Sequence, residues 1–430
     1  MTLNDEQSFA IKCLKLKKNI FITSKGAGCG KTYLLNYIKD SFGSFWGFNK
    51  NVITTATTGV AALLLNQGRT IHNWAGIGIG DKPVSELINN IKKCKADLRW
   101  MKVDILIIDE ISLMSPSLFD KLEEIARLIR NNNKPFGGIQ LILSGDWLQL
   151  PNIDSEYYAF ESKSWNKCID ITVYLKKILR QKNIHFQYIL NLIRIGNINS
   201  EVKETLLSRV NKNLDNPYGI KPTKLFCINS DIERINNNEL NKLKKKGQYI
   251  KDYLIQINLK YKSNLSFDQI CKLSNLPKNL NLTEGCQVML LTNLNLDSEL
   301  VNGSRGIIKT FSENGLPIVT FLNNMTIEIE YKNIDIVIDD KIIGTIKQIP
   351  LKLAYASTIH KMQGSTLDYV IIDLEKMFEV SQGYVGLSRV KDLDCLSISK
   401  INFEKFKVNK KALQFYEELD SNSNNELLTT

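Results

Sequence analysis

Short, continuous apolar runs alternate along the chain with segments whose apolar residues recur at helical spacing. Four runs fall in its first 145 residues, namely IFITS (20–24), VITTAT (52–57), VDILIID (103–109) and IQLILSG (139–145). Runs this short and uninterrupted are typical of strands buried on both faces. Helical patterns separate them, as in SPSLFDKLEEIARLIR, where Ser115 is a predicted N-cap and Pro116 stands in the first turn. This alternation predicts a parallel sheet with helices on its faces.

A second α/β region begins near Asn166, where TKLFCIN (223–229) has the pattern of another buried strand. From about 247 to 350 the pattern changes to strands and turns, which predicts a small β insertion. The α/β pattern then returns with DYVIIDL and CLSISKI. The polar end DSNSNNELLTT predicts a frayed tail within 409–430, after a C-terminal helix.

The charge balance narrows the range of partners only slightly. Among 430 residues, Lys and Arg number 56 and Asp and Glu 45, so the formal net charge is +11. A surplus of this size suits a polyanion, and it equally fits a solvated surface. The eight cysteines form no CxxC pair and only three histidines occur, so we expect no zinc site and a reduced, intracellular chain. No apolar run reaches the length of a membrane span, and the start MTLNDEQ lacks the features of a targeting signal.

The stretch KGAGCGKT (25–32) follows a predicted strand and precedes a predicted helix. In this setting, backbone N–H groups around Gly26, Gly28 and Gly30 would cradle phosphates. Lys31 would reach the β- and γ-phosphates, and Thr32 would bind Mg²⁺. The first glycine of the usual loop pattern is replaced by Lys25, which we expect just outside the cradle or over it.

Five further polar groups fit the same site. Asp109 and Glu110 end an apolar strand, at the edge where open α/β sheets bind ligands. Asp109 would hold Mg²⁺, and Glu110 would orient or deprotonate the attacking water. Gln149, Arg180 and Arg389 fit a role as γ-phosphate sensors, although each alone is more often an ordinary surface group. Together they suggest a cleft in which arginines of the second α/β unit face a nucleotide on the first.

Six blocks then occur in a fixed order: TATTGVAALLLNQGRTIHNWAGIG, LIIDEISLM, FGGIQLILSGDWLQLP, LVNGSRG, IPLKLAYASTIHKMQGSTLD and SQGYVGLSR. As a set, they resemble the petite-integration-frequency (Pif-type) helicases of superfamily 1B. The resemblance covers about residues 3 to 400. The blocks DEIS, TIHKMQG and VGLSR are specific as a group.

The resemblance implies an α/β fold with two RecA-like P-loop motor domains and ATP between them. It implies an ATP-dependent DNA helicase that translocates 5′ to 3′ on single-stranded DNA and unwinds duplex. The implied first motor covers 1–70 and 100–165, with a small wedge or pin insertion at 71–99. The second covers 166–246 and 351–408, with an SH3-like β insertion at 247–350.

The match also assigns roles residue by residue. Gln7 corresponds to the glutamine that reads adenine. The ATPase residues of the family match Lys31, Thr32, Asp109, Glu110, Gln149, Arg180 and Arg389. The positions that line its DNA track match Thr57, Thr58, His72, Trp74, Thr358, His360 and Lys361.

Several of these assignments have competing interpretations. Trp74 would stack on a base or pack in the core, and His72 and His360 would contact DNA or act as hydrogen-bonded structural histidines. The wedge would come from an aromatic residue in 71–99 or from Pro83. The chain also departs from the family pattern at Lys25, Trp74, Asn152, Ser381 and Gly386. These changes bear on loop geometry and rate and remove no charged catalytic group.

The expected cofactors are ATP and Mg²⁺, and the expected partners are single-stranded and forked duplex DNA. We expect a monomer located in the cytoplasm or at a site of DNA replication, such as a nucleus or a viral factory. Three alternatives stay open: a RecD-like motor subunit of a nuclease complex, a superfamily 1 RNA helicase, and a non-motor DNA-binding ATPase switch. The sequence does not choose among replication, repair, recombination and telomere maintenance.

Overall fold

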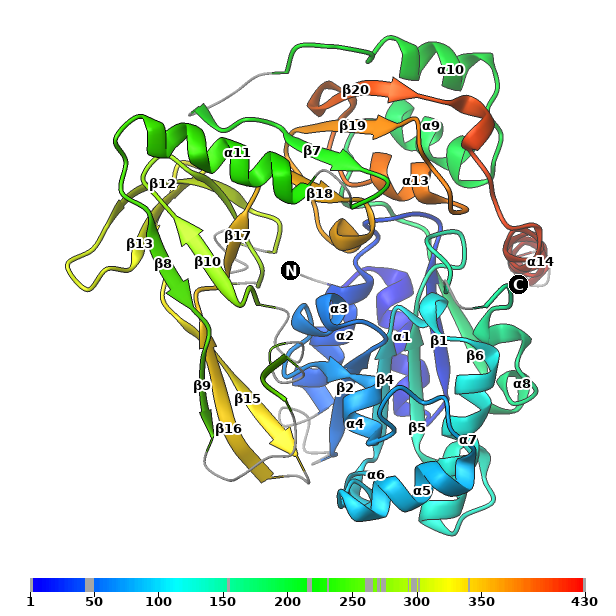
Figure 1. The fold of residues 1–430 in the computed structure, drawn as a ribbon. Coiled ribbons are helices and arrows are strands. Elements are labelled where there is room, and N and C mark those ends of the chain that lie inside the picture. Colours follow the sequence, from blue (N-terminus) through cyan, green and yellow to red (C-terminus); the bar gives the residue numbers. More distant parts are fainter. Residues whose placement is uncertain are drawn as a thin grey trace.

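Two parallel sheets flanked by helices and one antiparallel β insertion make up the protein (Figure 1). The computed structural model describes residues 3–42, 50–152, 155–214, 219–229, 232–259, 266–268, 271, 276–292, 294, 300, 302–338 and 341–427. The predicted fold class, α/β with two RecA-like units, is confirmed. None of the helices in these residues is both long and apolar enough to cross a membrane.

The first sheet has six parallel strands in the order β3-β2-β4-β5-β1-β6. Its strands are β1 (Ile20–Ser24), β2 (Val52–Ala56), β3 (Arg69–Thr70), β4 (Ile105–Asp109), β5 (Gln140–Ser144) and β6 (Ile171–Leu175). Strands β1 and β4 are buried along their whole length, as uninterrupted apolar runs predict.

Strand β6 corrects the predicted boundary of the first unit at residue 165. It pairs in parallel with β1, from Ile171 opposite Ile20 to Leu175 opposite Ser24. The first unit therefore extends to at least Leu175. An apolar run shows that a strand is buried but does not show which sheet it joins.

The helices of the first unit are α1 (Asp5–Lys15), α2 (Lys31–Asp40), α3 (Gly59–Leu63), α4 (Ile71–Ala75), α5 (Val84–Lys93), α6 (Asp97–Lys102), α7 (Pro116–Arg130) and α8 (Trp165–Cys168). Ser115 caps α7 as predicted, because its side chain accepts a hydrogen bond from the backbone N–H of Leu118. Helices α4 and α5 and the start of α6 lie within the predicted insertion at 71–99, and α6 continues to Lys102. Their buried residues belong to the same core as those of α7.

The second sheet has four parallel strands in the order β18-β7-β19-β20. They are β7 (Thr223–Phe226), β18 (Ala356–Thr358), β19 (Val370–Leu374) and β20 (Leu396–Ile401). Its helices are α9 (Ile184–Arg194), α10 (Ser200–Leu207), α11 (Ile232–Lys245) and α13 (Gln382–Leu387). A separate hydrophobic core, which includes Phe186 and Ile372, supports this unit.

The β insertion forms its own small core around Val288, Val319 and Phe321. It contains β8 (Lys251–Leu254), β9 (Gln256–Leu259), β10 (Asn279–Leu282), β11 (Gln287–Leu290), β12 (Arg305–Phe311), β13 (Pro317–Phe321), β14 (Thr326–Glu328), β15 (Lys332–Ile338), β16 (Lys341–Gln348) and β17 (Leu351–Leu353). Strand β17 pairs with β11, so the inserted sheet reaches Leu353, beyond the predicted end at 350.

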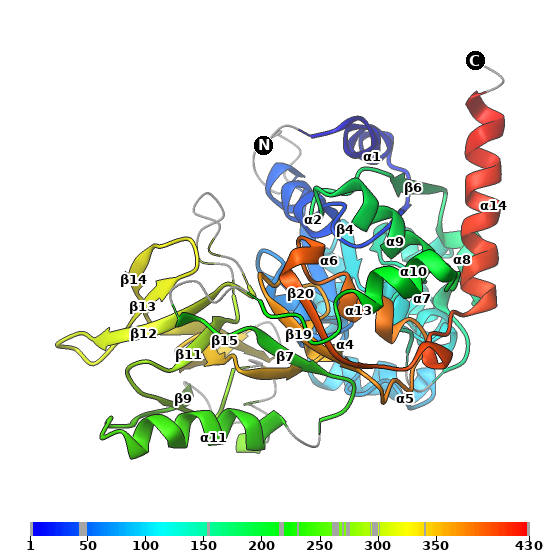
Figure 2. The same ribbon diagram turned by 90° about the horizontal axis from the view of Figure 1, so that it is seen from above.

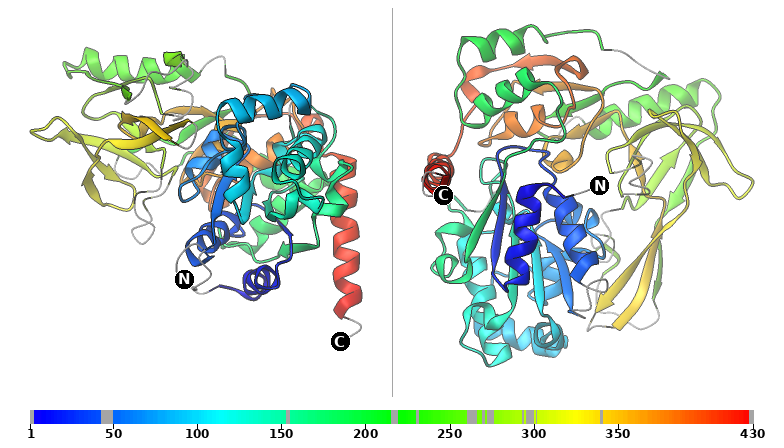
Figure 3. Two further views of the ribbon diagram at one scale, coloured as in Figure 1. Left: turned by 90° about the horizontal axis from the view of Figure 1, so that it is seen from below. Right: turned by 180° about the vertical axis from the view of Figure 1, so that it is seen from behind.

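The C-terminal helix α14 (Lys410–Leu427) stands at one edge of the molecule, beside the first unit (Figures 2 and 3). Ala412 and Tyr416 are buried in the core of that unit. The chain thus returns from the second unit to the first. The prediction of a frayed tail is wrong for the residues up to Leu427, because they form the last turns of α14.

Candidate nucleotide site and nucleic-acid track

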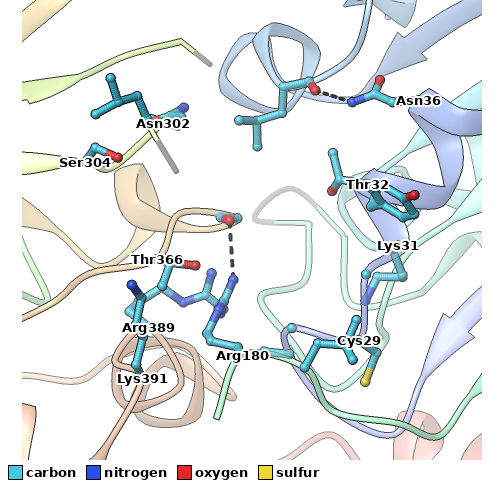
Figure 4. Close-up of a pocket in the computed structure, with 18 of the residues that line it drawn as sticks. Cys29, Lys31, Thr32, Asn36, Arg180, Asn302, Ser304, Thr366, Arg389 and Lys391 are labelled. Atoms are coloured by element: carbon cyan, nitrogen blue, oxygen red, sulfur yellow. Dashed lines mark hydrogen bonds between the residues drawn. The ribbon is translucent and has the colours of Figure 1, made fainter. Parts of the chain in front are cut away.

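A cavity of about 980 Å³ lies between the two α/β units (Figure 4). The first unit contributes the loop 27–32 together with Glu110 and Gln149. Arg389 reaches the cavity from the second unit, and Arg180 from the segment that joins the two units. Residues that are far apart in the sequence therefore face one space, as the sequence interpretation requires.

The loop between β1 and α2 is held open by glycines with positive φ. Gly28 has a φ of 86° and Gly30 a φ of 84°. A Cβ atom at Gly28 would clash with Cβ of Arg180, so no other residue fits there without displacing that arginine. The ammonium group of Lys31 donates to Oγ of Ser24 (2.7 Å), and in the described residues it has no carboxylate partner. The loop fits the phosphates of a nucleotide.

Lys25 lies outside this cradle. Its side chain is exposed, and its backbone N–H donates to the carbonyl oxygen of Leu175 at the end of β6 (2.9 Å). Of the two predicted positions, outside or over the cradle, this geometry matches the first. The backbone N–H of Ala27 donates to the hydroxyl of Tyr384 on α13 (2.8 Å), so the second unit contacts the loop directly.

Two adjacent carboxylates end strand β4 beside the loop. Asp109 is 4% exposed, and burial raises its pKa. Burial, followed by the charge of Asp109, raises the pKa of Glu110 to about 7. Nε2 of Gln363, from the second unit, donates to Oε2 of Glu110 (3.2 Å). A carboxylate with a pKa near neutrality suits a general base.

The same carboxylates fit a divalent cation. Asp109 and Thr32 bring oxygen atoms, which are the donors that Mg²⁺ prefers. Burial of two neighbouring acids disfavours their double ionisation, and a bound cation would relieve this.

The two arginines have no ion-pair partner in the part of the chain that the structure describes. Arg389 is 1% exposed and donates to the carbonyl oxygens of Val385 and Ser365. Arg180 donates to the carbonyl oxygens of Ser388 and Gly364. Burial, and then the charge of Arg389, lowers the pKa of Arg180 to about 9. Two neighbouring cations without counter-charge match a γ-phosphate position.

Gln149 is 5% exposed, and its Nε2 donates to Asp146 (3.1 Å). Asp146 is fully buried and accepts hydrogen bonds from Arg194 of α9 (2.8 Å) and from the Tyr416 hydroxyl of α14 (2.9 Å). Arg194 also donates to the carbonyl oxygen of Ser24 (3.0 Å). A buried polar cluster thus lies behind the phosphate loop.

The two polar side-chain atoms of Gln7 have different surroundings. Its Oε1 accepts from the backbone N–H of Asn4, which completes the N-terminal cap of α1. Its buried Nε2 has no hydrogen-bond partner among the described residues and lies 3.1 Å from the position of a Cβ at Gly30. An unpaired donor beside the loop fits the predicted contact with adenine.

The predicted track residues, apart from His72 and Trp74, lie at or just after the carboxyl ends of β2 and β18. Thr58 caps α3 through the backbone N–H of Ala61 (3.2 Å), and Thr57 donates to the Glu110 carbonyl (2.8 Å). Thr358 is 6% exposed and accepts from the backbone N–H of Lys361, whose side chain is exposed. Their DNA contacts stay predictions.

The structure favours structural roles for two of the predicted aromatic track residues, Trp74 and His360. Trp74 is fully buried and packs on Trp100 with ring centroids 4.6 Å apart, so its predicted stacking on a base is wrong and the core-packing alternative holds. His360 bonds through Nε2 to Glu379 (2.6 Å), which matches the alternative of a structural histidine. His72 is half-buried, and burial lowers its pKa, which favours the neutral form of the ring. Of the proposed wedge residues, Trp74 is excluded by burial, and Pro83 is exposed at the start of α5.

Five polar residues in or beside the site were not predicted from the sequence. Three of them stand inside the quoted blocks: Asp146 in SGDWLQLP, Gln363 in TIHKMQG and Tyr384 in SQGYVGLSR. Their position within a family block could have marked them as functional, but the sequence does not show which distant residues they contact. Arg194 and Tyr416 stand outside the blocks, and no pattern in the sequence singles them out.

The chain is similar to known helicases. The family described as PIF1-like helicase matches residues 2–204, and the 2B domain of DNA helicase Pif1 matches residues 267–311. A similar relative is the ATP-dependent DNA helicase PIF1 of Xenopus laevis, 36% identical over 97% of this chain and 64% of its own length. The uncharacterized protein 030L of invertebrate iridescent virus 6 is 39% identical over 97% of this chain and 94% of that protein. This chain thus spans somewhat less than two thirds of the Xenopus helicase.

Two solved structures are similar over nearly the whole chain. The Pif1 helicase from Candida albicans has a TM-score of 0.81 and 33% identity, with 97% of this chain and 100% of that chain covered. Pif1 from Bacteroides sp in complex with ADP-AlF4 has a TM-score of 0.82 and 28% identity, with 99% and 98% covered.

Proposed function

This chain belongs to the PIF1-like helicase family, and on that premise we propose that it is an ATP-dependent DNA helicase that moves 5′ to 3′ along single-stranded DNA and separates duplex strands. The observation that carries the proposal is the cavity where Lys31, Glu110 and Arg389 meet between two RecA-like units. The relatives named above as ATP-dependent DNA helicases, and the related structure with ADP-AlF4, support it.

In the proposed reaction, ATP lies in the cavity with its phosphates on the loop and on Lys31. Mg²⁺, held by Thr32 and Asp109, would neutralise part of the phosphate charge. Glu110 accepts a proton from the attacking water, helped by its raised pKa. Gln149 orients that water.

Arg180 and Arg389 stabilise the charge that develops on the transferred phosphoryl group. An arginine in this position contributes a factor of about 10³–10⁵ to the rate. Both guanidinium groups lack a carboxylate partner among the described residues, so they need an anion such as the γ-phosphate to neutralise their charge.

The same need for an anion couples hydrolysis to movement. A γ-phosphate draws Arg389 toward the loop, and its loss removes that attraction. Thr57 and Thr58 belong to one unit and Thr358 and Lys361 to the other. Closing and opening the cleft would therefore shift the two halves of the track relative to each other along the strand.

Strand separation of paired duplexes tests the proposal, one with a 5′ single-stranded tail and one with a 3′ tail, in ATP and Mg²⁺. We expect unwinding of the 5′-tailed duplex alone. Unwinding from the 3′ tail alone would overturn the polarity. DNA-stimulated ATP hydrolysis without unwinding and without displacement of a streptavidin block would favour a non-motor switch. Stronger stimulation by RNA oligomers than by DNA oligomers would favour an RNA helicase, and a stable co-purifying partner would favour the RecD-like alternative.

A further inference from the structure

Tyr384 lies on α13, between the second sheet and the phosphate loop of the first unit (Figure 1). Its side chain is 3% exposed, and its hydroxyl accepts a hydrogen bond from the backbone N–H of Ala27 (2.8 Å). Ala27 lines the cavity and belongs to the loop that is expected to bind phosphates. A buried side chain of the second unit therefore holds the loop backbone of the first.

The loop comes this close to the tyrosine because glycine stands at position 26. Gly26 is not among the glycines with positive φ, so the reason for a glycine here is space and not backbone conformation. A Cβ atom at Gly26 would lie 3.4 Å from the Tyr384 hydroxyl and 3.3 Å from Cδ1 of Ile178. A longer side chain would crowd both groups.

Two glycines pack α13 tightly into its own unit. A Cβ atom at Gly383 would lie 2.5 Å from Cε1 of Phe406. A Cβ atom at Gly386, one of the positions where the chain departs from the family pattern, would lie 2.5 Å from Cδ1 of Ile372 on β19. Because the helix packs this closely, we expect α13 to move with the second unit as one body.

Arg389 follows α13 and is oriented by it. Nε of Arg389 donates to the carbonyl oxygen of Val385 (2.8 Å), and its Nη2 donates to Oγ of Ser388 (3.0 Å). Both acceptors lie on α13 or at its C-terminal end. The guanidinium therefore keeps its place relative to Tyr384, one turn earlier in the chain.

We propose that Tyr384 is a positioning residue for ATP hydrolysis, which docks α13 on the phosphate loop through Ala27 and so places Arg389 against the transferred phosphoryl group. The inference rests on the proposed function. A displacement of about 1 Å at a catalytic group can cost about 10²-fold in rate, so one contact that sets this distance matters. Burial raises the pKa of Tyr384 to about 12, so the phenol keeps its proton at neutral pH and takes no part in proton transfer.

The first test compares Tyr384→Phe with Tyr355→Phe in steady-state ATP hydrolysis with saturating oligothymidylate. Tyr355 is the matched control, because it is 7% exposed and its hydroxyl also accepts from a backbone N–H, that of Gln287 (3.0 Å). Neither Tyr355 nor Gln287 lines the cavity. We expect Tyr384→Phe to lower kcat by about 2-fold to about 12-fold, the range for one hydrogen bond, with KM for ATP unchanged. Tyr355→Phe should keep the wild-type kcat, although denaturant unfolding should show a similar loss of stability in both variants.

The second test repeats Tyr384→Phe in the Arg389→Ala background, with hydrolysis measured in single turnover. Because Tyr384 acts through Arg389, its substitution should slow this variant no further. An equal loss with and without Arg389, or an equal loss of kcat in Tyr355→Phe, overturns the positioning role. Unchanged kcat in Tyr384→Phe also overturns it, and tighter ATP binding would then show that the hydroxyl only competes with a phosphate for the Ala27 amide. If wild type hydrolyses no ATP, the proposed function itself fails, and the positioning role with it.

Discussion

The two α/β units meet at two arginine sites, and the surroundings of the arginines differ. In the cleft, Arg180 and Arg389 contact backbone carbonyls, and burial lowers the pKa of each. Behind the loop, Arg194 pairs with Asp146 (2.8 Å), and the guanidinium lies 4.4 Å from the ring centroid of Tyr416. Burial alone would lower the pKa of Arg194, but Asp146 raises it.

This difference separates a fixed contact from a switchable one. The Arg194–Asp146 pair is satisfied without any ligand, so we expect it to hold α9 against the first unit with or without nucleotide. The cleft arginines donate to backbone carbonyl oxygens but have no carboxylate partner among the described residues, so only a bound anion would balance their charge. We therefore expect any separation of the two units to occur at the cleft and not at the Arg194–Asp146 contact.

Removing Arg389 should have the largest effect on turnover. We expect Arg389→Ala to lower kcat for ATP by about 10³–10⁵-fold, because the phosphoryl charge is no longer stabilised. Nucleotide affinity should change little, since the loop and Lys31 still bind the phosphates. Steady-state kinetics and nucleotide titration measure the two effects.

Lys391 provides the matched control for Arg389. It lines the same cavity, but it pairs with Asp368 (3.3 Å). Lys391→Ala should keep kcat within a few-fold of wild type. Normal turnover by Arg389→Ala would contradict its role in the cleft.

Breaking the fixed contact should cost stability. Asp146→Ala leaves Arg194 buried without its counter-charge, and we expect unfolding to become easier by about 3–5 kcal/mol. The double variant Asp146→Leu with Arg194→Met should recover most of that loss, because no charge is then left alone. Denaturant unfolding measures both. If Asp146→Ala lowers the free energy of unfolding by less than about 1 kcal/mol, the pair contributes no more than a surface ion pair. The proposed difference between this contact and the cleft arginines would then be wrong.

The contribution of α14 should be smaller. The Tyr416 hydroxyl bonds Asp146, the Thr23 side chain (2.5 Å) and the backbone N–H of Trp147 (3.2 Å). Tyr416→Phe keeps the ring over Arg194 and should lower the free energy of unfolding by about 1.5–3 kcal/mol, the range for a hydrogen bond to a charged group.

Tyr174→Phe is the control for Tyr416→Phe. Tyr174 is half-buried, its ring centroid lies 6.0 Å from that of Tyr416, and the structure gives its hydroxyl no hydrogen bond among the described residues. This variant should unfold like wild type. Equal effects of the two substitutions would mean that the Tyr416 hydroxyl has no special part in the cluster.

The cleft was largely predictable from the sequence, and the fixed contact was not. The loop 25–32 and the acids 109 and 110 are contiguous signals, and each ends or follows a recognisable buried strand. The contact between Arg194 and Asp146 joins residues of two units, and Tyr416 adds a helix from the end of the chain. Such pairs depend on tertiary packing, which no local pattern records.

Errors in the sequence interpretation have the same cause. The run at β6 is a strand, as its pattern predicts, but its partner β1 is distant in the sequence, so the predicted domain boundary is misplaced. The family match puts Trp74 in the track, but Trp100, on another helix, covers it. Burial of an aromatic residue depends on what packs against it.

Lowering the pH should reduce ATP hydrolysis in the cleft without breaking the Arg194–Asp146 pair. The pKa of Glu110 is raised to about 7. Burial would also raise the pKa of Asp146, but the neighbouring Arg194 lowers it below the usual range of an aspartate. If Glu110 is the base, kcat/KM for ATP should fall about tenfold per pH unit below about pH 7.

Stability should not follow that fall. Because the folded pKa of Asp146 is lowered, its contribution is present above the unfolded pKa and is lost only in strong acid. Because the pKa of Glu110 is raised, its contribution is present at low pH and is lost as the pH rises through about 7. The denaturation midpoint should therefore not drop between pH 8 and pH 6 on account of these two groups. A parallel loss of ATPase activity and stability over this range would show that acid unfolds the protein instead of protonating the base, and Glu110→Gln should abolish the acid limb along with most of the activity.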